Sequence, residues 1–92
     1  MKWTWDPTKE EANRQKHRFS FATAILVFDD PLALSRLDEY AYEERWQTIG
    51  KIDPNTIIVV HTLPEHESDA GRIISARKAT AHERRLYEEG KF

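Results

Sequence analysis

Three polar residues in the first part of the chain have the spacing of neighbours on one helix face. Asn13, Lys16 and His17 stand at positions i, i+3 and i+4, which lie side by side on an α-helix. An imidazole exchanges protons close to neutral pH, and an adjacent ammonium group binds anions. This face is therefore a candidate site for proton transfer. The alternative is structural, because Lys16 and His17 would also complement the dipole at a helix C-terminus.

A second group of candidate residues is cationic and lies near the other end of the chain. The segment 72–85 carries five cations and one acid, and a guanidinium group can donate two parallel hydrogen bonds to a phosphate. Strict alternation along a strand would place Arg72 and Arg77 on opposite sheet faces. A shared site for Arg72, Arg77 and Lys78, with Arg45 from a neighbouring strand, then requires a bulge or a strand end. The alternative is that these arginines pair with acids from the middle of the chain.

Other kinds of site receive little support. His61 stands in an apolar run, where a hydrogen-bonded core histidine is the simpler interpretation. His61, Glu65, His66 and Glu67 are close in sequence, but they lack the H-E-x-x-H spacing and any Cys partner. No glycine-rich nucleotide-binding loop and no nucleophile elbow occurs. We therefore expect no metal and no cofactor.

The bulk properties limit the class of protein. The 92 residues suffice for one small domain, which we place at 1–92. Without cysteine, a disulfide framework, a thiolate metal site and a thiol nucleophile are excluded. The absence of a signal-peptide pattern and of any long apolar stretch predicts a soluble, cytoplasmic protein without a membrane partner.

The net charge of −2 conceals a division along the chain. Residues 1–19 carry +2 and residues 72–85 carry +4, whereas residues 20–71 carry three cations against ten acids. Two basic ends around an acidic middle suggest one surface for a polyanion and another for a cationic partner. Simple solvation of charged faces is the alternative.

Local patterns predict the secondary structure of the first third. The segment 2–5 is a short strand with Trp3 and Trp5 on the same side. Asp6 caps a polar surface helix that starts with Pro7 and runs to His17. Ser20 caps a second helix, which ends before Pro31. Its apolar stripe has the helical spacing i, i+3, i+4 and i+7, at Phe21, Ala24, Ile25 and Phe28.

Strands dominate the remainder. We expect strands at 32–37, 44–52, 56–63 and 72–78, a turn at 53–55 and a loop at 64–71. The β-branched run 56–63 predicts a central strand buried on both faces. Thr80 and Glu83 form a capping box for a closing helix that ends at Gly90. The fold class is α+β: about four antiparallel strands plus a short N-terminal strand, with two N-terminal helices and one C-terminal helix. We expect these helices on one sheet face and a solvated opposite face.

Several stretches together resemble the BrnT family of type II toxins, small ribonucleases related in fold to the RelE toxins. These stretches are WDPTKEEANRQKH (5–17), FSFATAILVFDDP (19–31), ERW (44–46), IIVVHT (57–62) and RIISARKATAHERRLYE (72–88). The chain departs from the family at Arg18, where the family usually has Gly after Lys-His. Glycine suits a left-handed helix end, so Arg18 either strains this turn or adds a phosphate contact.

The resemblance implies a metal-independent endoribonuclease that causes growth arrest. It also implies a cognate BrnA-like antitoxin with a ribbon-helix-helix part, so DNA is contacted only through the toxin–antitoxin complex. In an RNA-cleaving site His17 is the candidate proton-transfer group, and Lys16 either favours the neutral imidazole or binds phosphate. Arg45 and Arg77 are candidates for transition-state charge, and Glu83 is a weaker candidate base than capping residue. The candidate substrate-binding residues are Asn13, Arg72, Lys78 and Arg84.

Two alternatives to the enzyme stay open. A non-catalytic module would bind nucleic acid through the basic C-terminal helix, with salt-dependent affinity and no cleavage products. A protein-binding scaffold would show neither nucleic-acid binding nor RNA cleavage.

Overall fold

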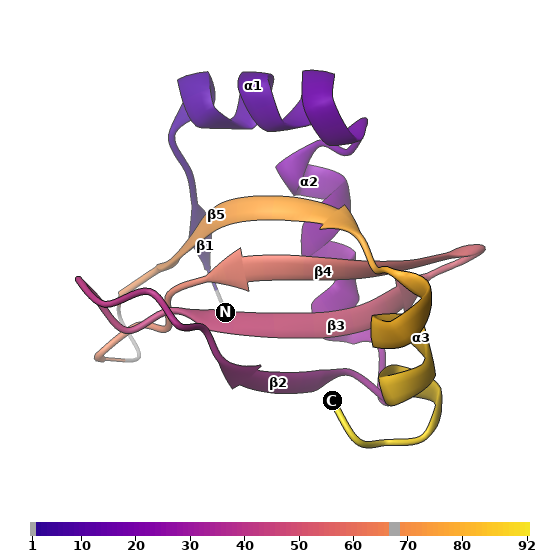
Figure 1. The fold of residues 1–92 in the computed structure, drawn as a ribbon. Coiled ribbons are helices and arrows are strands. Elements are labelled where there is room, and N and C mark those ends of the chain that lie inside the picture. The colour runs from indigo at the N-terminus through magenta and orange to yellow at the C-terminus, as the bar shows by residue number, and fades with distance from the viewer. Residues whose placement is uncertain (1, 67–68) are drawn as a thin grey trace.

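The computed structural model describes residues 2–66 and 69–92 and shows one sheet with helices on both sides (Figure 1). The strands are β1 (Trp3–Thr4), β2 (Leu34–Leu37), β3 (Trp46–Ile52), β4 (Asn55–His61) and β5 (Gly71–Lys78). The helices are α1 (Pro7–His17), α2 (Phe21–Ala24), the 3-10 helix η1 (Ile25–Asp29) and α3 (Ala81–Glu88). The expected α+β class and the expected order of elements are confirmed. The expected loop 64–71 includes residues 67–68, which lie outside the described residues.

The five strands follow the order β1-β5-β4-β3-β2. The four longer strands form the expected antiparallel meander, but β1 runs parallel to β5, so the sheet is mixed. The register pairs Trp3 with Gly71. A Cβ atom at Gly71 would lie 2.5 Å from the Trp3 ring, so only glycine permits this close approach.

The main core lies between the sheet and α2 with η1. Phe21, Ala24 and Val27 are fully buried against the inward side chains of β4 and β5. Trp3 stacks on Phe28 with 4.4 Å between ring centroids. The expected helical stripe is therefore confirmed, although the second half of that segment tightens into a 3-10 helix.

The second sheet face is also covered, contrary to the expectation that it is solvated. Ile49 and Ile58 point away from the α2 side, and both are 0% exposed. Figure 1 shows α3 in front of the sheet, with α2 and η1 behind it. The one-face arrangement was wrong because β3 and β4 carry apolar side chains on both faces, which both need cover.

A hydrogen-bond junction holds α3 to the rest of the fold. The Tyr87 hydroxyl on α3 donates to Asp30, which also accepts from the backbone N–H of Lys51 in β3 at 2.7 Å. Burial and the bond to Asp30 raise the pKa of Tyr87 to about 12. Among the described residues, no helix is long and apolar enough to span a membrane.

Candidate active site

The C-terminal end of α1 is a sharp turn that brings several polar side chains to one place. The expected Asp6 cap is confirmed, since its carboxylate accepts from the backbone N–H of Thr8 at 2.8 Å. At the other end, Arg18 adopts a left-handed conformation with φ of 66° and donates its backbone N–H to Arg14 at 2.7 Å. A residue with a Cβ atom is strained there.

Asn13 fixes the position of α1 on the sheet. Its amide nitrogen donates to the carbonyl of Ala76 at 2.9 Å, and its amide oxygen accepts from the N–H of Ala76 at 3.2 Å. The Asn13 side chain thus forms hydrogen bonds with the backbone at the edge of β5, as a neighbouring strand would. Asn13 was expected to bind substrate, but both ends of its amide are occupied by the backbone, so it acts as a positioning residue for Lys16 and His17.

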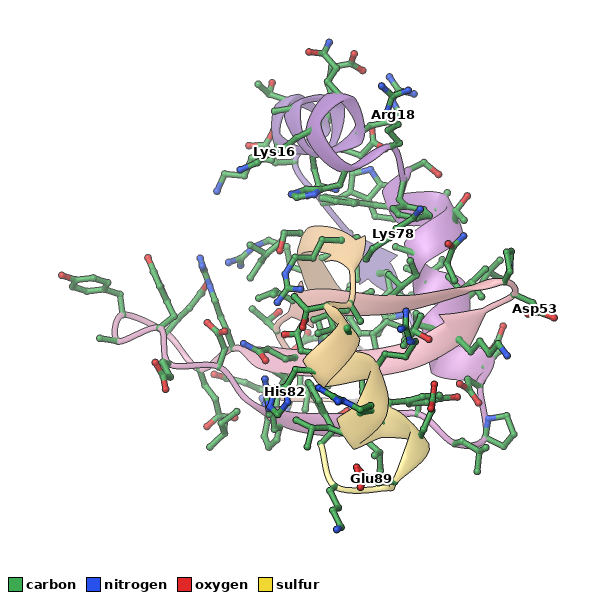
Figure 2. All side chains as sticks on the ribbon, turned by 45° about the vertical axis from the view of Figure 1, so that its right-hand side comes forward. Lys16, Arg18, Asp53, Lys78, His82 and Glu89 are labelled. Atoms are coloured by element: carbon green, nitrogen blue, oxygen red, sulfur yellow. The ribbon has the colours of Figure 1, made fainter. Side chains whose placement is uncertain are left out.

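The end of α1 meets the end of β5 at a pocket of about 750 Å³. We call this the basic pocket, and it is lined by Lys16, His17, Arg18, Phe19, Asn55, Arg77, Lys78 and Thr80. Figure 2 shows Lys16 and Arg18 above Lys78, whereas His82 and Glu89 lie lower, along α3. Residues from both basic ends of the chain therefore share one site, and no acid lines it among the described residues.

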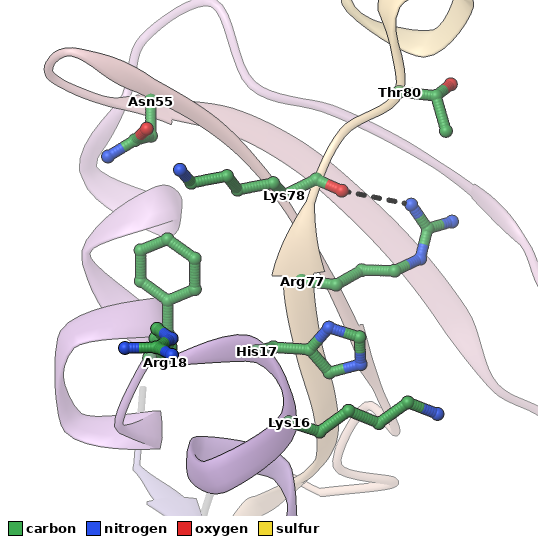
Figure 3. Close-up of a pocket in the computed structure, with 8 residues that line it drawn as sticks. Lys16, His17, Arg18, Asn55, Arg77, Lys78 and Thr80 are labelled. Carbon is green, nitrogen blue, oxygen red and sulfur yellow. Dashed lines mark hydrogen bonds between the residues drawn. The ribbon is translucent and has the colours of Figure 1, made fainter.

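The side chains divide the basic pocket into two sides (Figure 3). Lys16, His17 and Arg77 extend to one side, with the His17 ring between the other two. Lys78 extends the other way, toward Asn55. The arrangement places an imidazole between an ammonium and a guanidinium group.

Arg77 is held by Glu83 in a two-pronged ion pair. Its Nη1 and Nη2 atoms lie 2.8 and 2.9 Å from the two carboxylate oxygens of Glu83, and Nη1 also donates to the carbonyl of Lys78 at 3.3 Å. These bonds use three of the five N–H groups of a guanidinium. Within the described part of the chain, the remaining two are available to a ligand.

Glu83 is a capping and positioning residue rather than a base. It completes the expected capping box by accepting from the N–H of Thr80 at 2.8 Å. The hydrogen bonds from Arg77 lower the pKa of Glu83 to about 2. A carboxylate with so low a pKa is a poor proton acceptor at neutral pH. We therefore do not assign the role of general base to Glu83.

Arg45 and Arg72 do not join the basic pocket, contrary to the expectation of a single cationic site. Both guanidinium groups pair with the Glu43 carboxylate, and the distance from Arg45 Nε to Glu43 Oε1 is 2.9 Å. The Arg45 guanidinium also stacks over the Tyr40 ring. The irregularity opposite Val60 and His61 does turn Arg72 onto the face of Arg77. However, five residues of strand put about 16 Å between the two positions, so Arg72 lies at the opposite end of the sheet.

The remaining candidates also lie outside the pocket lining. Arg84 on α3 pairs with Glu88 across 3.8 Å. His61 is the expected core histidine: its Nε2 lies 2.7 Å from the Thr48 hydroxyl and its Nδ1 lies 3.0 Å from the Thr62 carbonyl. Burial lowers its pKa. Glu67 lies outside the described residues, and the described ones contain no cluster of three potential metal ligands.

Three of the lining residues carry no signal of a functional site in the sequence. Phe19 follows the helix end, Thr80 is visible only as a cap, and Asn55 appears only as a turn residue. The participation of Asn55 depends on the β3–β4 turn reaching the end of β5, and no spacing in the sequence signals this.

Residues 5–83 match a family described as the ribonuclease toxin, BrnT, of type II toxin-antitoxin systems. The matched span contains α1, β5 and Glu83. No curated protein matches the chain.

Proposed function

Because the chain belongs to the BrnT family of ribonuclease toxins of type II toxin-antitoxin systems, we propose that its basic pocket cleaves RNA internally without a metal ion. The observation that carries the proposal is the convergence of Lys16, His17, Arg77 and Lys78 on one pocket. These side chains come from two segments about sixty residues apart, and they supply the proton-transfer group and the cations that such a reaction needs.

The reaction uses the RNA as its own nucleophile. The 2′-oxygen attacks the adjacent phosphorus while its proton is removed, and the bond from phosphorus to the 5′-oxygen breaks. The leaving 5′-oxygen takes a proton, so the products carry a 2′,3′-cyclic phosphate and a 5′-hydroxyl. Neither water nor a protein nucleophile enters this step.

Each pocket residue receives a role in this step. His17 takes the proton from the 2′-hydroxyl, because it contributes the imidazole to the pocket. Lys16 extends to the same side and gives a proton to the leaving oxygen. Arg77, oriented by Glu83, donates to the charged phosphorane through its remaining N–H groups. Lys78 binds a neighbouring phosphate.

An antitoxin partner follows from the same family membership, and we infer a BrnA-like protein with a ribbon-helix-helix part. The acidic middle of the chain supports a basic contact segment on that partner. Asp38, Glu39, Glu43 and Glu44 lie in the connection between β2 and β3, at the end of the sheet far from the basic pocket. Charge complementarity there would favour a segment rich in Lys and Arg.

The test is cleavage by the purified chain in excess EDTA, followed by analysis of the RNA ends. We expect cleavage at an undiminished rate, with 2′,3′-cyclic phosphate ends. Complete loss of cleavage in EDTA would contradict metal independence, and binding without products would favour the non-catalytic alternative. In a bacterial host, expression of the chain alone is expected to arrest growth, and co-expression of the antitoxin to relieve the arrest.

A further inference from the structure

The basic pocket is larger and chemically more varied than one phosphate requires. Its volume of about 750 Å³ lies within the roughly 300–1,000 Å³ of sites that hold whole small molecules. Beyond the proton-transfer side, the lining contains an aromatic ring at Phe19 and an amide at Asn55. Neither group is needed to neutralise a phosphate.

Asn55 presents unused hydrogen-bonding capacity to the pocket. It is the first residue of β4 and pairs with Ile52 across the hairpin through the backbone. No side-chain hydrogen bond of its amide occurs among the described residues, whereas Asn13 uses both ends of its amide on Ala76. An amide offers two donors and one acceptor group, which is the combination that reads the edge of a nucleobase.

Phe19 is suited to bind the face of the same base. It lies directly after the left-handed residue Arg18 and packs against the core cluster while it also lines the pocket. Its ring is therefore anchored on one side and accessible on the other. Bases of single-stranded RNA stack on such aromatic side chains.

We propose that Phe19 and Asn55, with Lys78 beside them, form a base-recognition subsite for the nucleotide next to the cleaved phosphodiester. This rests on the proposed function, since it assigns the second side of the same pocket. The phosphate lies with Lys16, His17 and Arg77, and the base of that nucleotide lies on Phe19 with its edge toward Asn55. Lys78 extends toward Asn55 (Figure 3), so the neighbouring phosphate that it binds lies beside this base. The enzyme is thus selective for the base at one position.

The test compares cleavage of short RNAs that differ only in the base beside the single scissile bond. Wild type is expected to prefer one base by about fivefold or more, and Asn55→Ala to remove most of this preference. Asn55→Asp replaces an amide with a group that only accepts, so it is expected to shift preference toward adenine, cytosine and guanine, which present amino donors, and away from uracil. Gln15→Ala is the matched control, because this amide donates to Glu11 at 3.0 Å outside the pocket and should leave the preference unchanged.

A second variant tests the stacking partner without emptying the core. Phe19→Leu keeps an apolar side chain, and it is expected to raise KM by about fivefold or more through lost stacking, with thermal unfolding measured alongside. Wild-type cleavage with equal rates for all four bases, or an unchanged preference in both Asn55 variants, overturns the subsite alone. Absence of wild-type cleavage overturns the proposed function and the subsite with it.

Discussion

At the scale of single residues, the two arginines of β5 have different surroundings although they belong to the same strand. Arg77 lines the basic pocket and retains N–H groups for a ligand, whereas Arg72 pairs with Glu43 at the far end of the sheet. This contrast supplies a matched pair of variants.

We predict that Arg77→Ala lowers the cleavage rate by about a hundredfold, because a positioned guanidinium that meets developing charge is worth roughly this much. Arg72→Ala should cleave RNA nearly as fast as wild type. Single-turnover rates of both variants provide the measurement, with thermal unfolding as the check that each is folded. Equal losses in the two variants would contradict the placement of the site.

The ion pair between Arg77 and Glu83 makes folding stability depend on acid pH. The pKa of Glu83 is lowered from 4.5 to about 2 in the folded protein, chiefly by Arg77. A lowered carboxyl pKa stabilises the fold above the unfolded value, and this contribution is lost as the pH falls through the folded value. The relevant window is therefore between about pH 5 and pH 2.

We predict that Glu83→Gln reduces the free energy of unfolding by about 1–2 kcal/mol at pH 7, after allowance for solvent screening of the pair. The difference from wild type should shrink toward zero as the pH approaches 2. Urea unfolding at a series of pH values measures it. A difference that stays constant across this range would show that the ion pair does not account for the effect.

At the scale of helices and strands, the sequence could predict the interactions between residues close along the chain but not those between residues far apart. The caps at Asp6, Ser20 and Thr80 depend on residues within three positions, and all three are found. The bond from Asn13 to Ala76 joins residues 63 positions apart. It depends on how α1 crosses β5, which no local pattern specifies.

The register of β5 shows the same limit. The alternation of side chains along a strand correctly predicted that Arg72 and Arg77 need a bulge to share a face, and the irregularity is present. The sequence could not show that Arg72 has Glu43 as its partner, because that contact depends on the path of the connection between β2 and β3. Similarly, the burial of Ile49 and Ile58 on the second sheet face follows from tertiary packing.

The docking of α3 leads to a prediction at alkaline pH. The pKa of Tyr87 is raised to about 12 by burial and by its bond to Asp30. Because the folded state then holds the proton that the unfolded state releases near pH 10, stability falls as the pH rises from about 10 to 12. Tyr87→Phe should cost about 1 kcal/mol at pH 7. Its difference from wild type should disappear by about pH 12, as measured by urea unfolding, whereas a larger deficit at pH 12 than at pH 7 would be contrary to this account.

At the scale of the whole molecule, the basic pocket and the acidic connection between β2 and β3 lie at opposite ends of the sheet. The basic pocket forms where α1 and β5 end, and the acidic connection between β2 and β3 lies with Arg45 and Arg72 at the other end. A chain with a net charge of −2 can thus present a basic pocket at one end of its sheet. The acidic connection is the surface at which we propose that a basic antitoxin segment binds.

We predict that RNA binding by the basic pocket involves two to three phosphate contacts and therefore weakens as the salt concentration rises. The slope of log K against log salt should be about −2 for single strands. Titration of His17→Ala with a single-stranded RNA between low and physiological salt measures binding while cleavage is slowed. Lys78→Ala should reduce the slope, and Lys51→Ala, whose ammonium group lies 3.7 Å from Asp53 outside the pocket, should not. A slope near zero would be incompatible with a phosphate-binding pocket.

The most direct measurement of the central claim is the single-turnover rate of RNA cleavage in EDTA for wild type, His17→Ala and His66→Ala. His66 is an exposed imidazole in the connection between β4 and β5, so it serves as the matched control. We predict that His17→Ala cleaves at least about tenfold more slowly, as expected for loss of a general base, and that His66→Ala equals wild type. Cleavage by His17→Ala at the wild-type rate would contradict the claim that the basic pocket is the site of the reaction.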